Sequence, residues 1–221
     1  MTGFRLIAGL SIAAILTGLA YDLRRRFPTW KAAGDFLRRE LSDSRRVKRE
    51  GEAGGLGYVR RIVTITTGVL VLVLAVTGFL PVLFFGGHLS GSLLVIHVTA
   101  APVFALALSA LALLWAHRLR FDGTDWRTVE GAARWQFPPR DALVRFAVKA
   151  GFWTLLLLSL PLMLTVILGL FPLFGTDGEA LLIRLHGYSA LLLMTAALLE
   201  VYLIIACIGH SNEQPLKGQN P

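Results

Sequence analysis

The sequence contains a single cysteine, Cys207, among its 221 residues. A lone cysteine excludes an internal disulfide, a Cys-x-x-Cys-His attachment for c-type haem and a four-cysteine iron–sulfur site. Charged side chains are also scarce, at 16% of the chain compared with about 25% in ordinary soluble domains. Hydrophobic residues, in contrast, make up 55%. These proportions are typical of a polytopic membrane protein.

Five apolar runs approach or exceed the length of about 20 residues that a helix needs to cross a bilayer. They cover residues 4–21, 62–85, 91–116, 148–172 and 180–208. None of these runs alternates apolar and polar residues as the strands of a membrane β-barrel do. The sequence therefore predicts an all-α membrane protein with five transmembrane helices.

The basic residues are concentrated in two loops. Residues 22–61 contain twelve Lys and Arg and residues 117–149 contain seven, whereas the loops 86–90 and 173–179 contain none. With five spans the two basic loops lie on the same side, and the positive-inside rule makes that side cytoplasmic. We therefore expect the N-terminus outside and the C-terminus in the cytoplasm. The net charge of +8 is then explained by topology and by contact with anionic lipid, rather than by nucleic-acid binding.

The chain is expected to have four parts: an N-terminal transmembrane anchor (1–21), a basic cytoplasmic connector (22–58), a four-helix membrane domain (59–210) and a cytoplasmic tail (211–221). The connector alternates aromatic and basic residues, which favours an amphipathic helix at the membrane interface. The first span also fits a cleaved signal peptide. Cleavage would place twelve basic residues outside, so we favour an uncleaved anchor.

Two histidines lie inside predicted spans. His97 is seven residues into the third span and His186 is seven residues into the fifth, and both spans run from outside to inside. Both histidines are thus roughly 10 Å below the outer surface. Ionisable side chains inside a membrane are costly and usually face a partner. Two imidazoles at one depth on two helices suit the two axial positions of one haem b, while the alternative is a hydrogen bond from each histidine to a neighbouring helix.

The residues around these histidines are small, which leaves room for a flat macrocycle between helices. They are Ala100 and Ala101 after His97, and Gly187, Ser189 and Ala190 after His186. Arg184, at the outer end of the fifth span, suits haem propionates. The other histidines, His88, His117 and His210, lie in loops or at span ends, where solvated side chains are usual; His117 and His210 remain a candidate second site at the inner surface.

Several segments together resemble a known family. They are "RRIVTITTGVLVLVLAVTGFLP", "LLVIHVTAAPVFALAL", "TDW", "VKAGFWTLLLL" and "LIRLHGYSALLLMTAALLEVYLI". This order resembles the gamma (cytochrome b) subunit of membrane-bound formate dehydrogenases, a group related to bacterial cytochrome b561 and the b-type subunit of nickel–iron hydrogenases. The resemblance covers about residues 58–207. It implies that the last four spans form a cytochrome b-type four-helix bundle in the bacterial inner membrane.

The family usually carries two haems. The resemblance assigns the outer haem to His97 and His186, and it places Thr64 and Glu200 at the ligand positions of the inner haem. Neither threonine nor glutamate is a usual haem b ligand, so we expect one haem instead of two. Glu200 lies fourteen residues after His186, nearly on the same helix face and about 21 Å deeper. We expect its neutral form, hydrogen-bonded to Thr64 or Thr67 or handling a proton for a quinone.

These features favour a haem b membrane subunit of a redox complex. Its expected partners are quinone and a periplasmic oxidoreductase subunit or multihaem cytochrome c. The sequence contains no nucleophile–base arrangement, so we expect an electron-transfer subunit without catalytic residues of its own. Two alternatives remain: a haem-free anchor or assembly subunit, and a proton or solute carrier that uses Glu200.

Overall fold

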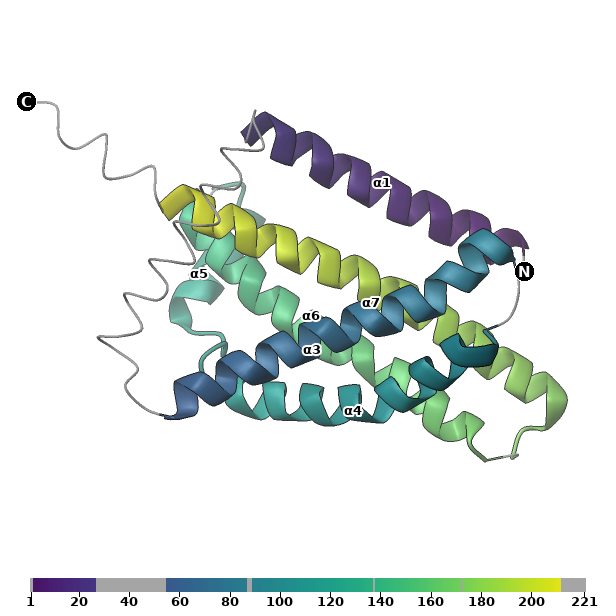
Figure 1. Cartoon of the computed structure of the whole chain (residues 1–221). Helices are drawn as coiled ribbons and strands as arrows, with labels where there is room; N and C mark the ends of the chain where they lie inside the picture. The colour runs from purple at the N-terminus through teal and green to yellow at the C-terminus, as the bar shows by residue number, and fades with distance from the viewer. Residues whose placement is uncertain (1, 27–54, 87–88, 137, 172, 212–221) are drawn as a thin grey trace, which may run out of the picture. The chain divides into compact units, whose positions relative to one another are not determined.

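The computed structural model describes residues 2–26, 55–86, 89–136, 138–171 and 173–211 (Figure 1). The described part of the chain is helical and contains no β-strand. It forms two compact units, Met1–Leu114 and Trp115–Pro221. Most of the connector, His88 and the C-terminal tail lie outside the described residues. The predictions of an amphipathic connector helix and of a solvated His88 therefore stay predictions.

Five helices are long and apolar enough to cross a membrane, as the sequence predicts. In the first unit they are α1 (Thr2–Arg26), α3 (Gly55–Leu80) continued by the π-helix η1 (Pro81–Phe85), and α4 (Gly91–Trp115). In the second they are α6 (Arg140–Gly169) and α7 (Gly175–Ser211). Large apolar side chains such as Leu106 and Leu164 are exposed on these helices, as expected where the surrounding solvent is lipid.

A single arginine joins α1 to the end of the second span. Arg5 Nη2 donates a hydrogen bond to the carbonyl of Leu83 at 3.2 Å. Gly86 ends η1 in the left-handed region, with φ of 65°, and a side chain at this glycine would meet Arg5 Nη1. Glycine is needed here both for its backbone conformation and for the close approach of the guanidinium. The guanidinium of Arg5 thus donates a hydrogen bond to a backbone carbonyl in the last turn of η1.

The helices α3 and α4 run in opposite directions and contact each other near both ends. At one end, Arg60 Nε donates to the carbonyl of Leu114 at 3.2 Å. At the other, Thr77 and Gly78 of α3 contact His97 of α4. The second turn of α3 and the last turn of α4 therefore lie close together, and so do the end of α3 and the early part of α4.

In the second unit α6 and α7 lie side by side along much of their length (Figure 1). Pro161 inside α6 lacks the N–H that would bond to the carbonyl of Leu157, and two hydroxyls near it bond to other carbonyls of the same helix. Ser159 Oγ donates to the carbonyl of Leu156 at 2.6 Å, and Thr165 Oγ1 donates to that of Leu162 at 2.8 Å. Both hydroxyls are buried.

The fourth and fifth spans begin earlier than the sequence predicts. The helix α6 starts at Arg140 rather than 148, and α7 starts at Gly175 rather than 180. The extra turns carry charged residues, which a hydropathy criterion rejects although they continue the helix beyond the apolar layer. Helix α6 thus extends past the apolar run, toward the short helix that precedes it.

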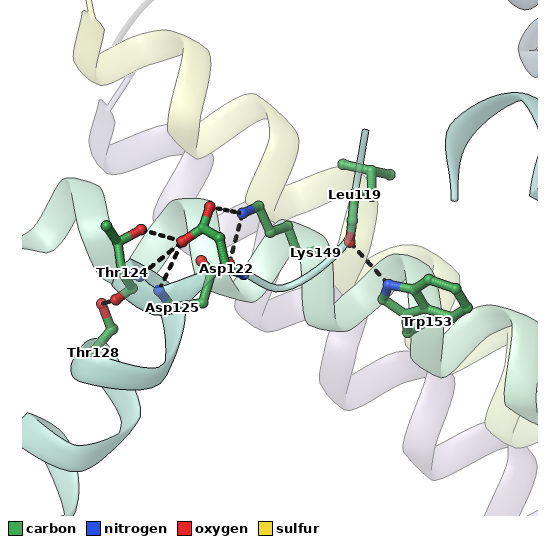
Figure 2. A network of polar contacts seen from close by, with 7 residues as sticks. All are labelled: Leu119, Asp122, Thr124, Asp125, Thr128, Lys149 and Trp153. Carbon is green, nitrogen blue, oxygen red and sulfur yellow. Dashed lines mark hydrogen bonds and ion pairs between the residues drawn. The ribbon is translucent and has the colours of Figure 1, made fainter. Parts of the chain in front are cut away.

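That short helix is α5 (Gly123–Ala133), and it is tied to α6 at its N-terminus (Figure 2). Asp122 caps α5 by accepting a hydrogen bond from the backbone N–H of Thr124 at 2.8 Å, and Asp125 accepts from the backbone N–H of Asp122 at 2.8 Å. This reciprocal pair is a capping box. Lys149 of α6 then binds both carboxylates, at 3.0 Å from Asp122 Oδ2 and 2.6 Å from Asp125 Oδ2.

We call Lys149, Asp122 and Asp125 the α5 clasp. One turn further along α6 than Lys149, Trp153 Nε1 donates a hydrogen bond to the carbonyl of Leu119 at 2.9 Å (Figure 2). Hydrogen bonds from Thr124 first, and then from Lys149, hold the pKa of the Asp122 carboxyl well below its usual range. An eleven-residue helix is marginal by itself, so these tertiary contacts account for its persistence.

Candidate functional site

His97 is oriented by a threonine of the preceding span. Thr77 Oγ1 lies 2.8 Å from His97 Nδ1 and 2.7 Å from the carbonyl of Val73 on its own helix. A hydroxyl has one proton to donate, and it goes to Val73 because a carbonyl oxygen can only accept. Thr77 Oγ1 therefore accepts from Nδ1–H of His97. This assignment places the proton on Nδ1 and the lone pair of the imidazole on Nε2.

The His97 ring is also packed against a glycine. A Cβ atom built on Gly78 would lie 3.2 Å from Cε1 of His97 and 3.7 Å from Nδ1. The first distance is tighter than normal van der Waals contact, so a side chain larger than hydrogen at residue 78 would crowd the ring. Together Thr77 and Gly78 fix the orientation of a half-buried imidazole.

His186 has the same kind of support in the other unit. Thr165 Oγ1 of α6 donates to the carbonyl of Leu162 at 2.8 Å and lies 3.2 Å from His186 Nδ1 on α7. The Thr165 hydroxyl is therefore placed to accept a hydrogen bond from Nδ1 of His186. The imidazole also makes a hydrogen bond with the backbone of Leu162, on the same turn of α6. His186, too, is half-buried.

Each histidine thus lies in the first half of its span, and the preceding span supplies a threonine to it. The threonine comes 20 residues before His97 and 21 residues before His186. Each threonine is within four residues of the end of its α-helix, at Leu80 or Gly169. Metal-ligating histidines usually donate one ring N–H to a neighbouring oxygen, which fixes the tautomer and makes the other nitrogen the ligand. Both histidines have a threonine oxygen within hydrogen-bond distance of Nδ1, which is the support that ligation through Nε2 requires.

The threonines and Gly78 were not identified from the sequence. The only available signal was the repeated spacing of a threonine near the end of one span and a histidine early in the next. The two histidines belong to different units: His97 contacts α3 from α4, and His186 contacts α6 from α7. The prediction that they bind one iron therefore stays a prediction.

The other predicted residues of the outer site are placed within α7. Arg184 is exposed, and its Nε donates to the carbonyl of Ala180 at 3.3 Å, one turn earlier on the same helix. Gly187, Ser189 and Ala190 are half-buried. Small side chains thus surround His186 on its own helix, as the sequence indicates.

Glu200 is buried between α6 and α7. Its side chain is 8% exposed, and its Oε2 has no hydrogen-bond partner among the described residues. Residue 151 of α6 is glycine, and a Cβ atom there would overlap the Glu200 carboxyl group. The carboxyl group therefore occupies the space that a side chain on α6 would otherwise fill. It is this absence of a side chain at residue 151 that allows a glutamate at residue 200.

The threonines that were expected to bind Glu200 make bonds within α3. Thr64 is exposed and donates to the carbonyl of Arg60 at 2.8 Å, and Thr67 is buried and donates to that of Val63 at 2.8 Å. These threonines belong to the first unit and Glu200 to the second. A bond between them stays a prediction.

The remaining histidines add no further ligands that the structure describes. His117 is exposed in the turn after α4, and the side chain of His210 lies outside the described residues. Within the described part of the chain, no three His, Cys, Asp or Glu side chains gather as a metal-binding group. A haem needs only two histidine ligands and would not appear as a group of three. The evidence for the predicted outer site is therefore the two Thr–His pairs.

Comparison with family models, curated proteins and solved structures finds no match to this chain. The resemblance to the gamma subunit of formate dehydrogenases therefore rests on the sequence segments that carry it. The described structure adds two features that do not depend on this resemblance, namely the pair of threonine-supported histidines and the buried Glu200.

Proposed function

We propose that this chain is a haem b-binding membrane subunit of a redox complex. The observation that carries the proposal is the shared support of His97 and His186, whose Nδ1 atoms each lie within hydrogen-bond distance of a threonine hydroxyl near the end of the preceding span. Ligation through Nε2 needs the proton on Nδ1, and each hydroxyl is placed to accept a hydrogen bond from it. This is the arrangement expected of histidines that bind iron.

The residues around both histidines fit a haem. Gly78 lies beside the ring of His97, and small residues follow His186, so flat macrocycle edges meet little steric resistance. Arg184 is exposed on the same helix as His186 and is available to pair with propionates through its other guanidinium nitrogens. A bound haem b supplies one-electron redox chemistry, whereas the chain supplies ligands, orientation and a low dielectric.

Electron exchange would take place between quinone and a redox partner on the outer side, such as an oxidoreductase subunit or a multihaem cytochrome c. The sequence supports this direction of contact, because the two histidines are near the outer end of their spans and the basic loops mark the inner side. The expected location is the bacterial inner membrane, with the N-terminus outside. The chain itself would be an electron-transfer subunit without a catalytic centre.

A second role is favoured by Glu200. A carboxyl group that is buried in a membrane helix pair, with one oxygen lacking a partner among the described residues, is suited to carrying a proton. It lies about 21 Å along α7 from His186, toward the inner side. Glu200, with Thr64 as a candidate neighbour, would then exchange protons with a quinone in the space of the lost inner haem.

The absorbance spectrum of the purified, full-length protein tests the proposed function. We expect the spectrum of a b-type cytochrome, with a reduced-minus-oxidised difference that quinol addition partly develops. A haem-free anchor and a proton or solute carrier would both lack this spectrum even after expression with excess haem. Absence of the spectrum under that condition would overturn the proposal.

A further inference from the structure

The exposed face of α5 has an unusual composition. Toward α6 the helix buries two polar residues, Asp125 and Thr128, which are 5% and 7% exposed. Trp126 and Val129, one turn apart on another face, are 60% and 36% exposed. An amphipathic helix of a soluble protein buries its apolar stripe, so the arrangement here is reversed. The apolar stripe of α5 is thus largely exposed, and the Trp126 ring lies 6.2 Å from that of Phe121.

The end of α5 exposes a second tryptophan at a cost. The backbone N–H of Gln136 donates to the carbonyl of Gly131 at 2.9 Å, and that of Trp135 donates to the carbonyl of Ala132 at 3.1 Å. This pair of bonds is a Schellman motif, in which the residue at the position of Trp135 adopts the left-handed conformation and is usually glycine. Trp135 adopts it with φ of 60°, and its side chain is 83% exposed. A strained, exposed tryptophan points to a role for its side chain.

The position of α5 along α6 is that of the bilayer interface. The candidate span of α6, Ala142–Gly169, has 28 residues and is about 42 Å long at about 1.5 Å per residue. The hydrocarbon core is only about 30 Å thick. The first turns of this span therefore extend into the headgroup layer, and α5 is attached there through Lys149. Phe121, just before α5, packs against Phe146 of the same turns, with ring centroids 5.6 Å apart.

Basic residues lie beside the apolar stripe. Arg127 follows Trp126, and Arg134 precedes Trp135; both arginines are exposed. Guanidinium groups bind phosphate oxygens in a bidentate geometry, and tryptophan is favoured at the boundary of acyl chains and headgroups. Exposed tryptophans and arginines close together on one short helix and its end are typical of interfacial membrane binding.

We propose that the outward face of α5 is a docking surface for anionic phospholipid. Trp126, Val129 and Trp135 enter the boundary between headgroups and acyl chains, and Arg127 and Arg134 bind lipid phosphates. The α5 clasp holds this surface at the correct depth, because it fixes the helix to Lys149 at the edge of the apolar layer. The proposal is independent of haem, since it concerns only the surface of α5.

The test uses the full-length protein in nanodiscs of phosphatidylcholine with about one third phosphatidylglycerol. Bromine is placed on the acyl chains of either lipid at equal mole fraction, and it quenches nearby tryptophans. The signal from Trp126 and Trp135 is the difference between the wild type and the Trp126→Phe/Trp135→Phe variant. We expect brominated phosphatidylglycerol to quench this signal about twofold more than brominated phosphatidylcholine.

Two variants separate recognition from general contact. Arg127→Gln/Arg134→Gln should remove the preference for phosphatidylglycerol, whereas Arg24→Gln/Arg61→Gln, which removes the same charge from exposed positions of α1 and α3, should keep it. Equal quenching by both lipids in the wild type would overturn the anionic preference. Absence of quenching by either lipid would show that the surface faces water or a protein partner, and would overturn the docking proposal.

Trp135→Gly separates a lipid role from a structural one. Glycine relieves the left-handed strain, so the thermal stability of the variant should be unchanged or higher. If Trp135 anchors α5 in lipid, the phosphatidylglycerol-dependent quenching of Trp126 should fall in this variant despite that stability. Undiminished quenching of Trp126 would show that Trp135 is dispensable for docking and would overturn its part of the proposal.

Discussion

Thr77 Oγ1 and His97 Nδ1, on consecutive spans, lie 2.8 Å apart. The threonine hydroxyl donates its own hydrogen bond to the carbonyl of Val73. The second unit repeats this relationship with Thr165 and His186 at 3.2 Å. A histidine that binds iron through Nε2 usually donates Nδ1–H to a neighbouring oxygen, and both threonine hydroxyls are placed to accept such a bond.

Replacing the threonines should weaken haem binding without removing the ligands. Thr77→Val and Thr165→Val keep the side-chain shape but lack the oxygen that accepts Nδ1–H. Loss of such a partner typically lowers metal affinity by about 10–100-fold. Titration of the apoprotein with haemin measures this affinity.

The matched controls are Thr77→Ser, which restores the acceptor, and Thr67→Val, which removes a hydroxyl that bonds to Val63 of its own helix. Both controls should bind haem as the wild type does. If Thr77→Val and Thr165→Val bind haem as tightly as Thr67→Val, the threonines do not orient iron ligands.

The contact between Gly151 and Glu200 should be intolerant of a single methyl group. Gly151→Ala places a Cβ atom where the Glu200 carboxyl group lies, so α6 and α7 must separate or the carboxyl group must move. Overpacking of this kind costs about 1–3 kcal/mol. We expect a lower unfolding temperature in detergent for Gly151→Ala but not for Gly169→Ala, because no atom lies within 4 Å of the Cβ position at Gly169.

Removing the glutamate should relieve that effect. In Gly151→Ala/Glu200→Ala the new methyl group meets no carboxyl group, so the double variant should be more stable than the sum of the single changes implies. Strict additivity of the two changes would contradict the close contact between these residues.

Glu200→Gln distinguishes proton handling from packing. Glutamine has the size of glutamate but cannot release a proton. If Glu200 serves a quinone as a general acid or base, haem content should be normal and quinol-linked haem reduction should slow by about 10²-fold. Stopped-flow absorbance with a soluble quinol measures the rate. Unchanged kinetics at every pH tested would leave Glu200 with a packing role alone.

The α5 clasp should resist acid. The pKa of Asp122 is lowered from its ordinary value of 3.8, by the hydrogen bonds from Thr124 and Lys149. A carboxyl group whose pKa is lower in the folded state contributes stability above the unfolded value, and this stability is lost as the pH falls below that value. The protection factors of the α5 amides, which correct the exchange rate for its intrinsic pH dependence, should therefore be the same at pH 7 and pH 5 and should fall only below about pH 4.

Variants show whether the clasp is responsible. Lys149→Met should accelerate exchange in α5 already at pH 7, whereas Glu130→Gln, a change at an exposed position of the same helix, should leave it unaltered. Protection factors of α5 that fall between pH 7 and pH 5 in the wild type would contradict the lowered pKa of Asp122.

The spans and the two membrane histidines could be predicted from the sequence, because apolar runs of this length and ionisable residues within them are strong signals. The threonine partners could not. A threonine in a membrane helix commonly donates to its own helix, and Thr67 does so just as Thr77 does. Only the three-dimensional approach of His97 distinguishes the two, and the sequence contains no local pattern for it.

The elements at the interface show the same limit. Lys149 reads as a charge at the start of an apolar span, and the contact with Asp122 and Asp125 depends on where α5 packs. Glycine is the residue expected at a left-handed helix end, so Trp135 in that position gives no signal in the sequence. In both cases tertiary contacts decide the structure against the local preference.

The central claim is that His97 and His186 bind one haem b, and the ratio of haem to polypeptide measures it most directly. A pyridine haemochrome assay on the purified protein should give about one haem b per chain, and His97→Ala and His186→Ala should each lose it while His117→Ala keeps it. A ratio of zero after expression with excess haem, or full retention of haem in both histidine variants, would contradict the account.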